Sequence, residues 1–217
     1  MPNLKNVNRG KIMDEHYAFF LKKFGPAMER REVPASSIAK YKHRLPDQLL
    51  DYWADHGWSG YAEGLFWTVN PQDYEEILDQ WLSDTKFCNQ DNYHVIARSA
   101  FGKLYVWGEK NGFSLTITSS MARYVERESK FKGDALDLGI RAFFSTKSPK
   151  TNGFEELFPP ALETLGLLKT DEMYGFVPAL ALGGPMELKN LKKVKTIEHL
   201  TFLSQLSPLQ DWGFPDV

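Results

Sequence analysis

The sequence contains very little cysteine: Cys88 is the only one among 217 residues. A single thiol cannot form a disulfide within the chain, and it cannot supply the paired cysteines of a structural zinc site. Small secreted proteins held together by disulfides are therefore excluded, and a reducing cytoplasm is the expected location. Hydrophobic residues make up 42% of the chain and aromatic residues 14%. This composition is sufficient for a core that forms without metals or cross-links.

Long apolar runs are also missing. No stretch approaches the roughly 18 uninterrupted apolar residues that predict a membrane-spanning helix. The first 20 residues, MPNLKNVNRGKIMDEHYAFF, contain no apolar run of signal-peptide length. We therefore expect neither a membrane segment nor a signal peptide.

Recognisable catalytic motifs are missing as well. The sequence has no GxSxG nucleophile elbow, no GxxxxGK[ST] phosphate loop and no HExxH zinc motif. Asp51, Asp55 and His56 are close in sequence, but on a helix His56 lies about 100° around the axis from Asp55, so the three do not converge on a metal. We expect no catalytic residues, no metal and no cofactor, and we interpret the chain as a binding protein rather than an enzyme.

Charged residues are distributed unevenly along the chain. The net charge is −2, yet residues 51–100 carry two basic and nine acidic side chains, which gives −7 for that stretch. Residues 101–150 carry nine basic and five acidic side chains, a net of +4. Ordinary surface variation is one interpretation of this asymmetry. An acidic face directed at a basic partner is the other.

The apolar periodicity predicts helices followed by strands. Helical spacing covers residues 13–24 and the stretch from Pro46 to Gly57, where proline suits the first turn and glycine the C-terminal cap. A buried strand is expected at 65–69 and a further helix at 70–82. Residues 93–118 change to a period of two and predict three strands, with Asn111-Gly112 as a two-residue hairpin turn.

The C-terminal third predicts a smaller module. The polar segment 145–153 indicates a linker or long loop, and helices are expected before Gly166 and over 188–206. The expected fold class is α+β: N-terminal helices with a small antiparallel sheet, packed against a smaller, mainly helical C-terminal module. The predicted domains are residues 13–140 and 141–207.

Two runs of sequence resemble a known family. LPDQLLDYWADHGWSGYAEGLFWTVNPQDYEEILDQWL, followed by ARSAFGKLYVWGEKNG, resembles the GAD-like domain of bacterial proteins. DEMYGFVPALALGGPMELKNLKKVKTIEHLTFLSQL resembles the domain that follows it in the same family. Proteins with this pairing are similar to immunity proteins encoded beside DNase toxins of the type VI secretion system. The resemblance implies tight binding of a cognate toxin in the cytoplasm, with no catalytic residues and no cofactor, and it supplies no binding motif.

The partner-binding residues are therefore predicted from physics alone. Because a DNase cleft is usually basic, the acidic stretch 51–100 is the expected contact surface. Large aromatic side chains often anchor such interfaces, and two of them fall in the expected Gly57–Gly64 loop, where they either reach the partner or fold back on the sheet. Trp53, Trp67 and Trp81 are expected in the core. The predicted partner-binding set is Asp51, Asp55, Trp58, Tyr61, Glu63, Asp73, Glu76 and Asp84.

Two alternatives remain open. A nucleic-acid-binding module requires basic residues on one face, either Lys40, Lys42 and Arg44 or Arg123, Arg127, Lys130 and Lys132. These clusters are short and are diluted by acidic residues, so nucleic acid is not the favoured partner. A small hydrolase acting on the toxin's product requires a metal or a buried histidine–carboxylate pair.

Overall fold

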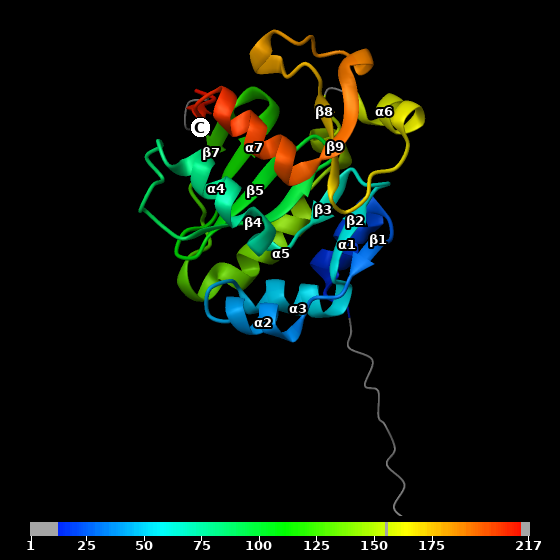
Figure 1. The fold of residues 1–217 in the computed structure, drawn as a ribbon. Helices are drawn as coiled ribbons and strands as arrows, with labels where there is room; N and C mark the ends of the chain where they lie inside the picture. The colour runs from blue at the N-terminus through cyan, green and yellow to red at the C-terminus, as the bar shows by residue number, and fades with distance from the viewer. Residues whose placement is uncertain (1–12, 155, 214–217) are drawn as a thin grey trace, which may run out of the picture.

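The computed structural model describes residues 13–154 and 156–213. Its centre is an eight-stranded sheet with the order β1-β2-β3-β4-β5-β6-β7-β10, and β8 pairs with β9 in a separate small sheet (Figure 1). The pairs are antiparallel except for β7 and β10, which are parallel. The strands are β1 (Met28–Arg31), β2 (Trp58–Tyr61), β3 (Phe66–Thr68), β4 (Tyr93–Ser99), β5 (Lys103–Gly108), β6 (Gly112–Thr118), β7 (Arg123–Glu126), β8 (Glu172–Phe176), β9 (Leu191–Lys195) and β10 (Gln210–Asp211).

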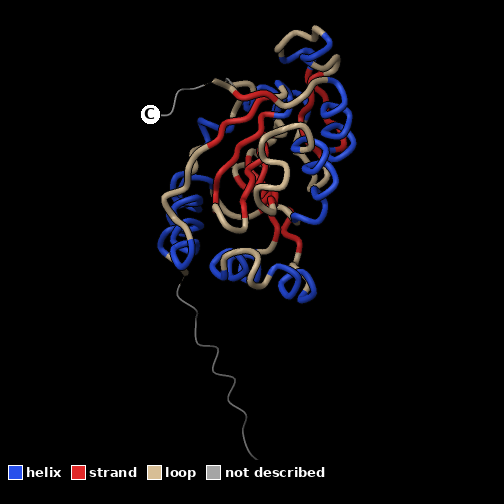
Figure 2. The backbone as a smooth tube through the Cα atoms, turned by 90° about the vertical axis from the view of Figure 1, so that its left-hand side faces the viewer, coloured by secondary structure: helices blue, strands red, loops and turns tan. Residues whose placement is uncertain are grey.

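Helices cover both faces of the large sheet. One face packs against α1 (Glu15–Phe24), α2 (Ala35–Tyr41), α3 (Asp47–His56) and α5 (Leu136–Thr146). The other packs against α4 (Glu75–Leu82), α6 (Phe158–Leu165), α7 (Thr196–Leu206) and the small sheet. Figure 2 shows the strands running between these helical layers. Short 3₁₀ helices are η1 (Pro71–Tyr74), η2 (Ser119–Met121), η3 (Gly133–Ala135), η4 (Pro149–Asn152), η5 (Leu180–Leu182) and η6 (Leu188–Asn190).

The fold class is α+β, as the sequence predicts, but the sheet is larger than expected. Strands β4, β5 and β6 form the predicted antiparallel run, and β3 and β7 pair with its two sides. In contrast, β1, β2 and β10 come from segments with no strand pattern. Gly60 explains why β2 resembles a loop in sequence. A Cβ atom at Gly60 would lie 2.9 Å from the ring of Trp67 on β3, so the strand needs glycine at this point of close approach.

Helix ends follow the local signals in the sequence. The Asp14 side chain accepts hydrogen bonds from the backbone N–H groups of His16 and Tyr17 and so caps α1. Pro46 precedes α3, and Gly57 ends it with a φ of 69°, a region that favours glycine. The indole-bearing side chains expected in the core, Trp53, Trp67 and Trp81, are all buried.

The hairpin between β5 and β6 forms, but its turn differs from the prediction. Gly108 pairs with Gly112, so the turn contains three residues rather than two. Only Gly112 of the Asn111-Gly112 pair has a positive φ, of 72°. The turn is held from outside, because the Asp91 carboxylate accepts hydrogen bonds from the backbone N–H groups of Lys110 and Asn111.

The C-terminal third also departs from the prediction. The expected helix over 188–206 is wrong in its first part: η6 and β9 come before α7, and β9 pairs with β8 from Glu172↔Lys195 to Phe176↔Leu191. Pairing with β8 thus overrides a helical pattern of leucine and valine. The expected linker at 145–153 is instead the end of α5 followed by η4, where the Asn152 side chain is buried.

The two predicted domains are packed together closely. The boundary at residue 140 falls within α5, whose helix contacts α1. Arg98 on β4 is fully buried and donates hydrogen bonds to the carbonyl oxygens of Thr170 and Glu172, each at 2.9 Å. In addition, the backbone N–H of Tyr174 donates to the carbonyl of Ala100. None of the helices within the described ranges has the length and apolar character needed to cross a membrane.

Candidate partner-binding surface

The first group of predicted acidic residues lies on α3. On that helix, the side chains of Leu49, Leu50 and Trp53 face the core of the protein. Asp51 and Asp55 are exposed on the opposite side of the helix. Asp47 is exposed as well and extends the pattern at a spacing of four residues. Residues four apart share a helix face, so α3 presents a line of three carboxylates. The sequence analysis missed Asp47, although the spacing was already visible.

The second group lies on η1, α4 and the turn after them. Asp73, Glu76 and Asp84 are all exposed, and α4 buries Ile77, Leu78, Trp81 and Leu82 beneath them. Asp73 lies 3.8 Å from the guanidinium of Arg31 on β1, so part of its charge is balanced locally. An ion pair at an exposed site offsets only a modest part of the charge of the carboxylate.

The structure does not gather the predicted carboxylates into one patch. Asp51 and Asp55 belong to the helical layer on one face of the sheet, whereas Glu76 on α4 belongs to the layer on the other face. Glu63 is exposed in the turn between β2 and β3, where its φ is 56°. The predicted acidic surface is therefore divided among α3, the β2–β3 turn and the α4 region.

Of the two outcomes left open for Trp58 and Tyr61, the structure shows the second, so their inclusion in the predicted partner-binding set is wrong. Trp58 and Tyr61 lie in strand β2 rather than in a loop, and their exposed fractions are 4% and 0%. The Trp58 ring packs against Trp53, and the Tyr61 hydroxyl is 2.8 Å from the hydroxyl of Tyr17 on α1. Both side chains are part of the core, because pairing with β1 and β3 holds this segment inside the sheet.

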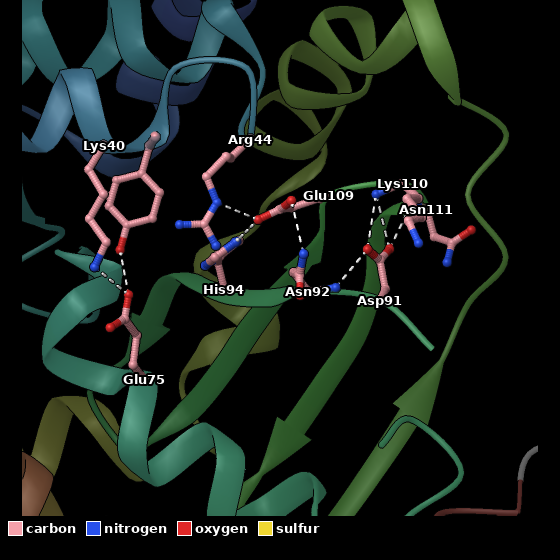
Figure 3. A network of polar contacts seen from close by, with 10 residues as sticks. Lys40, Arg44, Glu75, Asp91, Asn92, His94, Glu109, Lys110 and Asn111 are labelled. Atoms are coloured by element: carbon pink, nitrogen blue, oxygen red, sulfur yellow. Dashed lines mark hydrogen bonds and ion pairs between the residues drawn. The ribbon is translucent and has the colours of Figure 1, made fainter. Parts of the chain in front are cut away.

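A polar network joins α2, α4 and one end of the sheet (Figure 3). Lys40 donates to the Glu75 carboxylate at 2.8 Å, and the Tyr41 hydroxyl donates to the same oxygen at 3.2 Å. Burial acts to raise the pKa of Glu75, but these hydrogen bonds outweigh it and lower the pKa below its usual value. Sequence reasoning missed this contact, because the two segments are 35 residues apart.

A buried histidine forms the second half of this network. His94 on β4 is 4% exposed, and its Nε2 lies 2.8 Å from a carboxylate oxygen of Glu109, which also accepts from Arg44 at 2.8 Å. Burial lowers the pKa of His94 more than the Glu109 carboxylate raises it. Burial also acts to raise the pKa of Glu109, but hydrogen bonds from His94, Asn92 and Arg44 lower it overall. Neutral His94 therefore donates from Nε2.

The His94–Glu109 contact is the kind of pair that the hydrolase alternative requires. Here, however, Nδ1 of His94 is buried with no hydrogen-bond partner among the described residues, and the ring packs edge-on against Tyr41. Arg44 and His94 both bind the Glu109 carboxylate. This arrangement fastens the turn between α2 and α3 to the sheet. In the described part of the chain, no group of three or more histidine, cysteine or carboxylate side chains could hold a metal ion.

Some of the basic side chains that the nucleic-acid alternative requires are engaged in protein contacts. Lys40 and Arg44 are each bound to a carboxylate, as described above. In the second cluster, Lys132 pairs with Glu128 at 3.0 Å, and Arg123 donates to the carbonyl oxygen of Asp211. Two cations of each cluster are therefore engaged by other groups of the protein.

Comparisons with known proteins agree on the architecture. The family model of the GAD-like domain matches residues 15–121, and that of the C-terminal domain of the T6SS immunity protein Tdi1 matches residues 138–207. The crystal structure of Atu4351 from Agrobacterium tumefaciens is similar, with a TM-score of 0.81 and 25% sequence identity over 92% of this chain and 94% of that chain. No curated protein matches the sequence.

Proposed function

The chain belongs to the type VI secretion immunity family, with a GAD-like domain followed by the Tdi1 C-terminal domain, and we propose its function on that premise. It neutralises one cognate toxin by forming a stoichiometric complex with it, and it acts by binding rather than by catalysis. The match to the immunity domain over residues 138–207 is the observation that carries this proposal.

The proposed toxin is a nuclease with a basic cleft. A protein that acts on DNA must attract a polyanion, so lysine and arginine side chains usually surround its active site. An inhibitor that presents carboxylates to those side chains is drawn to the cleft, associates faster and docks in a defined orientation. The encounter takes place in the cytoplasm, where a DNase reaches its substrate.

Two exposed acidic surfaces are suited to this role. The first is the α3 surface, which we define as Asp47, Asp51 and Asp55. The second is the α4 surface, defined as Asp73, Glu76 and Asp84. The α3 surface is the preferred docking site, because its regular spacing places all three charges on one side of a single rigid helix. Glu63 adds charge at the β2–β3 turn.

Charge reversal separates the two surfaces. Asp51→Lys with Asp55→Lys changes the α3 surface, and Glu76→Lys with Asp84→Lys changes the α4 surface by the same amount. The matched control is Glu163→Lys with Glu198→Lys, at exposed positions on α6 and α7. The partner is the toxin encoded beside this chain, and association rates are measured by stopped flow at several salt concentrations.

The α3 double variant should associate at least about tenfold more slowly at low salt and lose most of its salt dependence, since steered and unsteered association differ by more than this factor. The control should associate normally. Unchanged rates in both acidic variants would overturn the docking assignment while leaving the immunity function intact. Failure of the unmodified protein to bind the toxin or protect cells from it would overturn the function itself.

A further inference from the structure

Lys147, directly after α5, has an unusual environment. Its ammonium lies 4.1 Å from the ring centroid of Phe143, 4.4 Å from that of Tyr105 and 4.6 Å from that of Phe113. The side chain is partly exposed. Across residues 13–154 and 156–213, no hydrogen bond or ion pair ties this ammonium to an oxygen atom. It therefore has aromatic rings around it but no acceptor.

Three further cations repel the Lys147 ammonium, and each comes from a different part of the chain. Lys23 on α1 donates to the backbone carbonyls of Ser145 and Lys147, and Lys103 on β5 donates to that of Thr151 at 2.8 Å. Arg127 follows β7 and is exposed. The partners of the two lysines are neutral carbonyls, so their charges are not cancelled.

This environment favours the neutral amine. Burial against the rings removes water from the ammonium, and repulsion from Arg127, Lys103 and Lys23 adds to the effect, so that the pKa of Lys147 falls from 10.5 to about 7. The ring faces attract a cation and oppose the change, but they do not outweigh it. An uncharged amine is the nucleophilic form of lysine.

We propose that Lys147 is a site of covalent acylation, and that the reagent is a small acyl phosphate. Lys147 is partly exposed despite the rings around it, which gives a small reagent a route to the amine, and the neighbouring cations suit the phosphate group. An ammonium has three N–H donors. Lys23 uses two of them and Lys103 uses one, so both retain donors for phosphate oxygens.

The step is a simple acyl transfer. The nitrogen lone pair of Lys147 forms a bond to the acyl carbon, and the bond from that carbon to the phosphate oxygen breaks. Phosphate leaves with the electron pair and takes up the proton that the amine loses. The product is an uncharged amide that can no longer take up a proton, so Lys147 can no longer add a fourth positive charge to the cluster. Relief of this repulsion favours the modified protein.

The test treats the folded protein with acetyl phosphate between pH 6 and 9 and follows acetylation of each lysine by mass spectrometry. The exposed Lys150, close in sequence, is the internal reference. Lys147 should react on the order of tenfold faster than Lys150 at pH 7, because its lowered pKa leaves a large share of its own amine neutral, although a less basic amine is intrinsically less reactive. Its rate should level off above pH 7, and inorganic phosphate should compete.

Two variants and one reagent sharpen the result. Lys103→Met removes a neighbouring charge, so the inflection in the rate of Lys147 should move to higher pH, whereas Lys150→Met should leave it unchanged. An uncharged acetyl ester should also favour Lys147 but without competition by phosphate. Equal rates at Lys147 and Lys150 with acetyl phosphate, or a rate at Lys147 that keeps rising through pH 9, would overturn the proposal.

Discussion

Replacing Arg98 with methionine tests what holds the two halves of the chain together. Arg98 is fully buried on β4 and bonds to two carbonyl oxygens near β8, those of Thr170 and Glu172. Its guanidinium also lies over the ring of Trp67, 5.0 Å from the centroid. Methionine reproduces the aliphatic part of the side chain but not the guanidinium, so both carbonyls lose the donor that Arg98 supplies.

The expected loss follows from these contacts. A hydrogen bond from a charged donor contributes about 1.5–3 kcal/mol net, so two of them contribute roughly 3–6 kcal/mol. Removing a buried charge recovers part of that, because the ion no longer has to be kept out of water. We expect Arg98→Met to lower the free energy of unfolding by about 3 kcal/mol, a large share of the roughly 5–15 kcal/mol typical of a domain.

Urea unfolding followed by tryptophan fluorescence measures the loss, and hydrogen exchange locates it. The amides of β8 should exchange faster in the variant than those of β5. Arg30→Met is the control, since Arg30 is exposed and forms an ion pair with exposed Glu32 at 3.6 Å, and such pairs contribute about 1 kcal/mol or less. If Arg98→Met and Arg30→Met unfold at the same urea concentration, Arg98 does not join the two halves.

Three further predictions concern stability. The folded protein should lose stability as the pH falls below 6.5, because burial lowers the pKa of His94 and only the unfolded chain takes up the proton; below 4.5 Glu109 adds to the loss in the same direction. Urea midpoints that stay constant from pH 8 to pH 4 would contradict this. Gly60→Ala should cost about 1–3 kcal/mol in thermal unfolding, because the added methyl meets Trp67, while Gly153→Ala, with 3.8 Å to its nearest atom, should be nearly neutral. Lys147→Met should stabilise the protein by about 1 kcal/mol or more at pH 7. It should also flatten the rise in stability between pH 7 and pH 10.5, where only the unfolded chain retains the proton; an unchanged slope would be evidence against the lowered pKa of Lys147.

The parts of the fold that depend on local signals were predictable. The Asp14 cap, the proline before α3 and the glycine after it act within one turn of helix, so the sequence determines them directly. The same periodicity correctly placed Asp51 and Asp55 on the outside of α3. Strand β2 was not predictable in this way, because Gly60 signals a turn until the ring of Trp67 is seen lying against it.

The candidate site illustrates the same limit. Helical periodicity predicts which side chains of one helix are exposed, but it does not say that α3 and α4 lie on opposite faces of a sheet. Nor does it show that Tyr61 meets Tyr17, since that contact spans 44 residues. The cation cluster at Lys147 was missed for this reason: its four members come from four segments that are distant in sequence, and no motif connects them.

The edge strand β10 of the large sheet has a practical consequence for anyone who truncates this chain. The Tdi1 domain match ends at residue 207, yet β10 at Gln210–Asp211 is the strand that covers the edge of β7, with hydrogen bonds to Ala122 and Tyr124. A fragment trimmed at the family boundary would expose the backbone of β7 along its full length. Open edges recruit strands from neighbouring molecules. Such a fragment is expected to self-associate or aggregate, and a poorly behaved preparation would then reflect the cut rather than the domain.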